Sequence, residues 1–267
     1  HPRRGPVLHN QPGKLPYAEM MSVNAAAEIE RLKPAAVLIK GDLTDAGQEK
    51  DWQKFKEIWG RFGERLYWVC GNHDVHSGRP VSAPQMVRIE LPGAILALLD
   101  TTIERSATGQ ISQEQLTWLE SLAKNADRPV MIFGHHHLWT PRHRRKTGYF
   151  GINPGDSEKL IALFRQYDCL IGYFSGHTHS NRVEHLPDLP GVIFAQTAAL
   201  KEFPGAFFEY RVYEGGVQQI MHRVSAPESL QWEAMTSKQE GGRYAHNHYG
   251  KLAERCFTII PRAVRQQ

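Results

Sequence analysis

The sequence predicts an α/β fold built as one large domain, and three observations support this. Between residues 35 and 70 the order of segments is strand, helix, strand, which implies a parallel pair with a right-handed crossover. Four separate apolar runs end in a glycine followed by aspartate, asparagine or histidine. The 267 residues, 41% hydrophobic and 22% charged, have an ordinary globular composition. This length is enough for one full core, or for a core with a small extension.

The first half of the chain is expected to alternate between helices and buried strands. Residues 1–17 are rich in proline, glycine and basic side chains and are interpreted as a loop. Stretches 18–32 and 48–61 carry apolar side chains at helical spacing and are predicted helices. Short apolar runs predict the strands: residues 35–39, 66–70, 86–91, 94–99 and 129–133.

In the second half, Ser112 and Gln115 form a capping-box pattern that predicts a helix to about residue 122. Asp156 is predicted to cap another helix, which ends near Tyr167. A fourth buried strand is expected over 169–174. Further strands, expected to be antiparallel, are predicted at residues 181–185, 192–195, 207–213 and 217–224, and one late strand is predicted near 257–260. The pattern weakens from residue 226, so we expect a domain over 1–225 and an extension over 226–267 that packs on it or caps its site.

Net charge, cysteine spacing and the length of apolar runs limit the kinds of partner that we expect for this chain. The net charge of +4 is small and the basic residues form no extended stripe with aromatics, so a nucleic-acid polymer is not expected as a partner. Cys70, Cys169 and Cys256 are far apart and indicate neither a disulfide framework nor a thiolate metal site. No apolar run reaches the length of a membrane span, so we expect a soluble protein without a membrane partner, and a cytoplasmic location is favoured. The oligomeric state is left open.

The glycine-ended strands are the feature that predicts chemistry. The carboxyl ends of parallel strands meet at one edge of a sheet, so the side chains that follow them can share a site. Carboxylate, amide oxygen and neutral imidazole together suit Zn, Mn or Fe. On extended chain, His177 and His179 would point to the same side. Two metal ions close together can clamp a phosphate and activate water. Taken singly, each ending also fits a helix cap or a turn. The four endings are Gly41-Asp42, Gly71-Asn72, Gly134-His135 and Gly176-His177.

The order of these motifs resembles that of the calcineurin-like metallophosphoesterases, in particular their small phosphodiesterase-type branch. The matching pieces are Gly41-Asp42-x-x-Asp45, Gly71-Asn72-His73-Asp74, a histidine after the third strand, and Gly176-His177-x-His179. The resemblance covers residues 1 to about 224. It implies the metallo-dependent phosphatase fold, a four-layer α-β-β-α sandwich of two mixed sheets packed face to face.

The resemblance also implies roles for individual residues. Asp42 would bridge two metal ions of the Mn, Fe or Zn type, while Asn72, His135 and His177 would hold the second ion and His179 the first. His73 would not bind metal. It would act as an acid or electrophile on the phosphoryl group, oriented by Asp45. Hydroxide activated by the two metals would attack in line, without a covalent intermediate.

The implied substrate is a small phosphoester, and a phosphodiester is preferred. A phosphomonoesterase or a protein phosphatase would use the same parts and remains an alternative.

One motif of the family is absent. The family opens with Asp-x-His at the end of a first strand, but residues 1–17 contain no aspartate. His1 lies about where that histidine falls, so we expect the sequence to begin just inside the motif, with His1 as its remaining ligand. The alternative is a natural loss, which leaves the first metal to Asp42 and His179. A non-catalytic scaffold on the same fold would follow from such a loss.

The residues next to these motifs are assigned secondary roles. His135 is the first choice for the ligand after the third strand, with His136 as the second choice and otherwise a substrate contact. Arg142 and Arg144 belong to a basic loop that suits an anionic group of the substrate, although a solvated loop is the simpler interpretation. Asp74 is expected to bond the backbone of its loop. His246 and His248 in the tail are expected to be surface or lid residues and not ligands.

Overall fold

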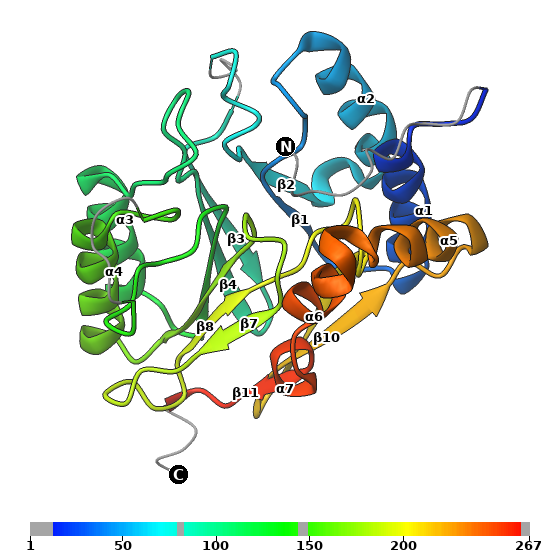
Figure 1. Ribbon diagram of the computed structural model, residues 1–267. Coiled ribbons are helices and arrows are strands. Elements are labelled where there is room, and N and C mark those ends of the chain that lie inside the picture. The colour runs from blue at the N-terminus through cyan, green and yellow to red at the C-terminus, as the bar shows by residue number, and fades with distance from the viewer. Residues whose placement is uncertain (1–12, 79–82, 144–148, 263–267) are drawn as a thin grey trace.

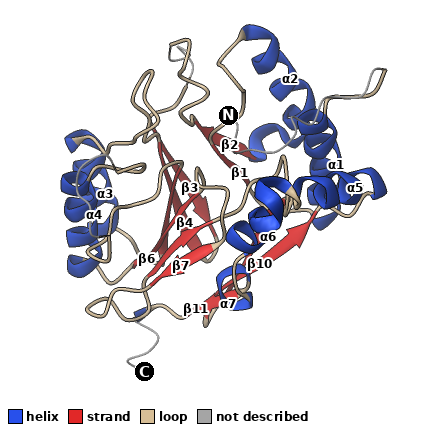
Figure 2. Ribbon diagram, in the orientation of Figure 1, coloured by secondary structure: helices blue, strands red, loops and turns tan. Residues whose placement is uncertain are grey.

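Helices and strands lie in four layers in the computed structural model, which describes residues 13–78, 83–143 and 149–262 (Figure 1). A six-stranded sheet forms one inner layer, and two smaller sheets form the other. Helices cover the outer side of each, as the colouring by secondary structure shows (Figure 2). The predicted α-β-β-α architecture is confirmed.

The larger sheet is mixed, with the order β3-β4-β5-β6-β8-β7. Its four central strands are parallel, and its two edge strands pair antiparallel with their neighbours. The strands are β3 (Met86–Leu91), β4 (Ala94–Leu99), β5 (Val130–Gly134), β6 (Leu170–Ser175), β7 (Arg182–Glu184) and β8 (Ile193–Gln196). The expectation of an antiparallel strand at 192–195 is therefore half right, because β8 pairs parallel with β6 and antiparallel with β7.

The second inner layer consists of two hydrogen-bonded sheets within the described residues, where one mixed sheet was expected. Strands β1 (Val37–Lys40) and β2 (Leu66–Val69) form the parallel pair that the β-α-β order predicts. Strands β9 (Ala206–Tyr213), β10 (Gly216–Arg223) and β11 (Phe257–Ile259) form an antiparallel sheet in the order β11-β10-β9.

Three hydrophobic cores separate the four layers. The first lies between the large sheet and helices α3 (Gln113–Lys124) and α4 (Pro154–Gln166). The second lies between the two inner layers and contains Phe133 and Val217. The third packs helices against the β1–β2 pair. Its helices are α1 (Tyr17–Leu32), α2 (Glu49–Trp59) and α5 (Pro227–Thr236), with the 3-10 turn η1 (Gly60–Arg65) after α2.

The caps of α3 and α4 are formed by side chains at the start of each helix, and one of the two predicted caps is wrong. Ser112 and Gln115 form the predicted capping box at the start of α3. The cap of α4 is Asn153, whose side chain accepts a hydrogen bond from the Asp156 backbone at 2.9 Å. Asp156 therefore lies in the first turn and is not the cap. In the sequence, the Asn153-Pro154 pair is the pattern that indicates this helix start, because proline is favoured just inside a helix start.

The C-terminal segment contains helices that the sequence pattern did not predict. After α5 come η2 (Gln239–Gly242), α6 (Arg243–Tyr249) and α7 (Leu252–Arg255), before β11. The buried positions of α5 include Ser229, Glu233 and Thr236, so this helix has no apolar stripe to read. In Figure 1 α6 lies between α5 and α7, and α7 contacts β7 and β10.

Candidate metal centre

The turns after β1 and β2 touch through their backbones. Gly41 has a φ of +89°, and a Cβ added to it would lie 2.5 Å from the Gly71 amide nitrogen. A Cβ on Gly71 would lie 2.3 Å from the Asp42 amide nitrogen. Both positions therefore require glycine, for the close approach and, at Gly41, also for the left-handed backbone. The contact brings Asp42 and Asn72 together.

Asp74 ties these two turns to each other. Its carboxylate accepts hydrogen bonds from the backbone N–H groups of Gly71 and Thr44, both at 2.7 Å, and from that of Leu43 at 3.1 Å. The prediction that Asp74 bonds loop backbone is confirmed. Burial raises the pKa of this carboxyl, although the hydrogen bonds oppose the rise.

His135, at the end of β5, lies at the centre of the candidate site. Its Nδ1 lies 2.8 Å from the Lys40 carbonyl oxygen. A carbonyl only accepts, so Nδ1 carries the proton and the lone pair of Nε2 points to the other side. A histidine held in this way by a backbone carbonyl is oriented for binding metal.

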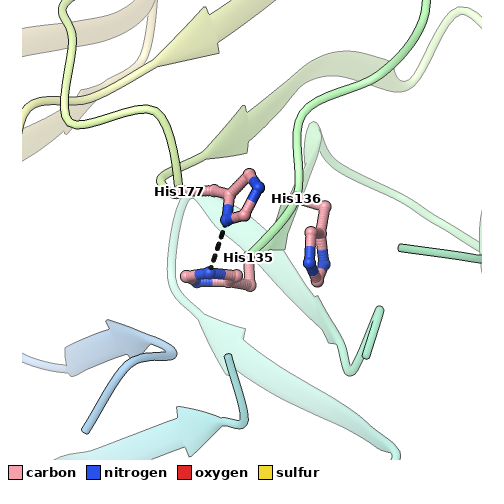
Figure 3. A group of neighbouring side chains, drawn as sticks. All are labelled: His135, His136 and His177. Atoms are coloured by element: carbon pink, nitrogen blue, oxygen red, sulfur yellow. Dashed lines mark hydrogen bonds between the residues drawn. The ribbon is translucent and has the colours of Figure 1, made fainter. Parts of the chain in front are cut away.

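Around that lone pair three more electron-pair donors converge. The Nε2 atom of His135 lies 3.1 Å from Asn72 Oδ1, 3.4 Å from Asp42 Oδ1 and 3.2 Å from His177 Nδ1. Figure 3 shows the ring of His177 facing that of His135, with His136 beside them. The carboxylate of Asp42 and the amide oxygen of Asn72 are half-buried beside imidazole nitrogens, and a cation would bind to all of these electron-pair donors.

The electrostatics agree with such a set. Burial lowers the pKa of His177 to about 3, with further lowering by His135 and His137, so at neutral pH its imidazole is neutral and able to bind metal. Burial by itself would raise the pKa of Asp42, but the neighbouring histidines outweigh it and keep this pKa below its usual range.

His136 lies deeper than a substrate contact would. Its side chain is completely buried, and its Nδ1 lies 2.8 Å from Thr101 Oγ1. Its Nε2 is buried without a hydrogen-bond partner among the described residues, and one of its ring nitrogens lies within 4.8 Å of one ring nitrogen each of His135 and His177. This placement disagrees with the predicted direct contact with substrate, because no face of the ring reaches solvent. Arg142 is exposed, whereas Arg144 lies outside the described residues.

His73 lies at the rim of the site. Its Nδ1 lies 2.7 Å from the Asp45 carbonyl oxygen and 3.6 Å from the Asp45 carboxylate, whose side chain is 91% exposed. The nearer contact is thus with the backbone of Asp45 and not with the carboxylate assumed from the sequence. The His73 backbone N–H also donates to Asp42 at 3.2 Å, which fixes His73 next to the cluster.

The comparison with known proteins agrees with this arrangement. A family profile described as calcineurin-like phosphoesterase matches residues 18–181, which is more than half of the chain. The chain belongs to this family. The match contains the turns after β1, β2, β5 and β6, so every residue of the cluster described above falls within it.

Similar members of the calcineurin-like phosphoesterase family include two bacterial proteins. A glycerophosphodiester phosphodiesterase, GpdQ of Enterobacter lignolyticus, is 27% identical over 163 residues, covering 56% of this chain and 58% of that protein. A 3′,5′-cyclic adenosine monophosphate phosphodiesterase, CpdA of Haemophilus influenzae, is 25% identical over 185 residues, covering 61% and 64%. The alignment thus spans less than two thirds of either relative.

The fold is shared with a solved structure of a dimetal phosphatase from Danio rerio. The TM-score is 0.62 at 12% identity, over 91% of this chain and 89% of that one. Within the described residues, no helix of this calcineurin-like phosphoesterase has both the length and the apolarity that crossing a bilayer requires.

His179 contacts a different set of residues from those around His135. The prediction that His177 and His179 lie on extended chain is wrong. His177 and His179 both have left-handed backbone, with φ of +67° and +54°, so the extended chain assumed from their spacing is absent. His179 Nδ1 lies 2.7 Å from Glu202 Oε1. Burial would raise the pKa of Glu202, but the hydrogen bond and charge of His179 and the hydroxyl of Tyr244 lower it to about 2. His1, the remaining predicted ligand, lies outside the described residues.

Two side chains that contact predicted ligand histidines were not identified from the sequence. Glu202 lies on a loop after β8 that carries no motif. Phe150 is 52% exposed and stacks on the ring of His177, with 4.1 Å between centroids and 29° between planes. An exposed aromatic residue is not unusual in itself, so its only signal is its position beside the site.

Proposed function

We propose that this chain is a metal-dependent phosphodiesterase acting on small phosphodiesters. The observation that carries the proposal is the convergence of Asp42, Asn72 and His177 on the unprotonated nitrogen of His135, with His73 at the rim. Family membership and the phosphodiesterase names of two relatives support it. The proposal includes a dinuclear centre, for which the dimetal phosphatase of the same fold is a structural parallel.

The residues have the following roles in this proposal. Asn72, His135 and His177 would hold one ion and His179 the other, and the two oxygens of Asp42 would be available to both. Bound metals of the Mn, Fe or Zn type would supply Lewis acidity that activates water and polarises the phosphoryl oxygens. The protein itself contributes the neutral imidazole of His177, the oriented ring of His135 and the half-buried carboxylate of Asp42.

His73 moves the proton in this proposal. Its Nδ1 hydrogen is donated to the Asp45 carbonyl, so in the protonated ring the Nε2 hydrogen is free for the leaving oxygen of the ester. Removal of such an acid costs about 10²–10⁴-fold in rate. His73→Ala is therefore expected to lose activity by about that factor while the protein still binds metal.

Phe150 favours a diester that carries a flat apolar group. Its exposed ring lies against His177 and so borders the place where a phosphoryl group would be bound. A nucleoside or another aromatic ester group can stack on such a ring. A phosphomonoester is the second candidate, because the fold is shared with a protein named as a phosphatase.

The test is a hydrolysis panel on the purified chain. Bis-p-nitrophenyl phosphate, p-nitrophenyl phosphate, cyclic AMP and glycerophosphoethanolamine are each assayed with added Mn²⁺, Zn²⁺ or Fe²⁺, and metal content is measured by elemental analysis. We expect faster turnover of the diesters, together with loss of both metal and activity in Asp42→Asn. A chain that binds metal but cleaves only the monoester would establish the second candidate, and one that does neither would refute the proposal.

A further inference from the structure

Glu202 joins His179 to the C-terminal segment. The same Glu202 oxygen that lies 2.7 Å from His179 Nδ1 also accepts a hydrogen bond from the hydroxyl of Tyr244, on α6. The Glu202 side chain is 17% exposed and the His179 side chain is 29% exposed. A largely buried carboxylate is thus satisfied by two groups that lie far from it in the sequence.

Helix α6 makes further contacts with the segment around His179. The ring of His248 stacks on Tyr244, with 3.9 Å between centroids. His248 Nδ1 lies 2.8 Å from Ser180 Oγ and 3.0 Å from the His179 carbonyl oxygen. The Asn181 backbone N–H donates to the His248 carbonyl at 3.1 Å. Residues 179–181, which begin at a left-handed histidine, are therefore fixed by a helix that follows them by about sixty residues.

These contacts determine which nitrogen of His179 is available. The carboxylate of Glu202 can only accept, so Nδ1 carries the hydrogen of that bond and Nε2 keeps its lone pair. A carboxylate that orients a histidine in this way also makes the free nitrogen a better electron-pair donor. The arrangement is the one expected behind a metal ligand, whereas a purely structural histidine needs no particular nitrogen left free.

We propose that Glu202 and Tyr244 are positioning residues that set the tautomer and direction of His179, so that α6 belongs to the metal centre. The inference rests on the proposed function, because it takes His179 as a ligand. It gives the segment after β10 a definite role, since the Tyr244 hydroxyl holds the carboxylate that in turn orients the ligand.

The experiment compares Tyr244→Phe and Glu202→Gln with the parent chain and with Tyr249→Phe. Tyr249 lies on the same helix and contributes its ring to Phe203 and Arg255, so this control removes the same atom from the same element. Mn²⁺ binding is measured by calorimetric titration of metal-free protein, and thermal unfolding is followed in chelator. KM and kcat for bis-p-nitrophenyl phosphate are measured at saturating Mn²⁺.

We expect Tyr244→Phe and Glu202→Gln to weaken the binding of one Mn²⁺ by about 10–100-fold, with the control unchanged. Excess Mn²⁺ should restore much of kcat in Tyr244→Phe. The inference is overturned if the two variants unfold at lower temperature but bind Mn²⁺ as the parent does, because the contacts are then structural only. If Glu202→Gln does not fold, Tyr244→Phe alone decides. A parent chain that binds no Mn²⁺ would refute the proposed function as well. If the parent chain binds Mn²⁺ and hydrolyses the ester but the variants bind Mn²⁺ equally well, only the positioning role is refuted.

Discussion

Two groups of histidines border the candidate site, and the chain builds them in different ways. His135, His136 and His177 stand at the ends of β5 and β6, in the interior of the large sheet, and they are almost completely buried. His179 lies on a loop and is oriented by Glu202 and by α6. The first group is placed by parallel strand pairing. The second is placed by a few hydrogen bonds between segments that are remote in sequence.

This difference indicates that the two groups of histidines are held with different rigidity. Strand ends are fixed by the ladder and by the cores on both sides of the sheet, so their side chains keep one geometry. A loop that depends on a few polar contacts opens at a lower free energy than the sheet does. We call His135, His136 and His177 the strand-end group, and His179 with Glu202 and α6 the His179 group. We therefore expect the strand-end group to control whether metal binds at all, and the His179 group to control how tightly a second ion is held.

The largest expected effect is that of His135→Ala. The substitution removes the nitrogen on which Asp42, Asn72 and His177 converge, so we expect loss of bound metal and a fall in kcat of about 10²–10³-fold, the scale of losing a main electrostatic contribution. His179→Ala should cost less and be partly restored by excess Mn²⁺. Elemental analysis and steady-state kinetics of both variants check this, and equal, unrecoverable losses would remove the distinction between the two groups.

A second prediction concerns the loss of folding stability at acidic pH. Burial is the first cause that lowers the pKa of His136, His137 and His177, the last two to about 3. In the unfolded chain each takes up a proton near pH 6.5, so below that pH the unfolded state binds more protons and stability is lost as the pH falls. In metal-free protein the free energy of unfolding should fall by about 4 kcal/mol per pH unit from these three groups, at about 1.4 each.

Denaturant titrations in chelator between pH 7 and pH 4 measure that slope. His137→Gln should reduce it to about two thirds, since two of the three buried histidines remain. Asn247→Gln, a change at an exposed tail position that alters no titratable group, serves as the control and should leave the slope as it is. A slope that does not change in His137→Gln would show that this ring is not held neutral by the fold.

A smaller effect is expected at Phe150, which borders the strand-end group. Stacking of a base on an aromatic ring contributes about 1–3 kcal/mol, so Phe150→Ala should lower kcat/KM for cyclic AMP by about tenfold. The value for glycerophosphoethanolamine, which has no aromatic group, should change little. Equal losses for both substrates would indicate that Phe150 supports His177 and does not contact the substrate.

The smallest effect is expected in the His179 group, at Ser180. Its hydroxyl bonds the Thr178 carbonyl and lies close to His248, so Ser180→Ala should lower the free energy of unfolding by about 1 kcal/mol. Because Asn181 and Tyr244 still hold α6, Mn²⁺ affinity should stay within about twofold. A large loss of affinity would mean that one hydroxyl, and not the set of contacts, fixes this loop.

The strand-end group was predictable because its signal is local. A buried strand, a glycine and a metal-binding side chain follow one another within a few residues, and parallel pairing then brings such ends together. For Gly41 and Gly71, close backbone contact explains the glycine, and for Asp74 the predicted backbone bonds are present.

The His179 group had no comparable signal. Glu202 lies 23 residues from His179 and 42 from Tyr244, and no spacing rule connects positions so far apart. Helix α6 is seven residues long and buries only Tyr244, so it has no stripe that reveals its partner face. The backbone after Gly176 also turns left-handed twice, which residue spacing read as extended chain does not predict.

The contact between Gly41 and Gly71 has a consequence for any attempt to re-engineer this protein. Because the two turns touch atom to atom, a replacement turn with any side chain at position 41 or 71 would displace the other turn. A turn grafted from a relative should therefore be accepted when it keeps glycine at the contact and should fail when it does not.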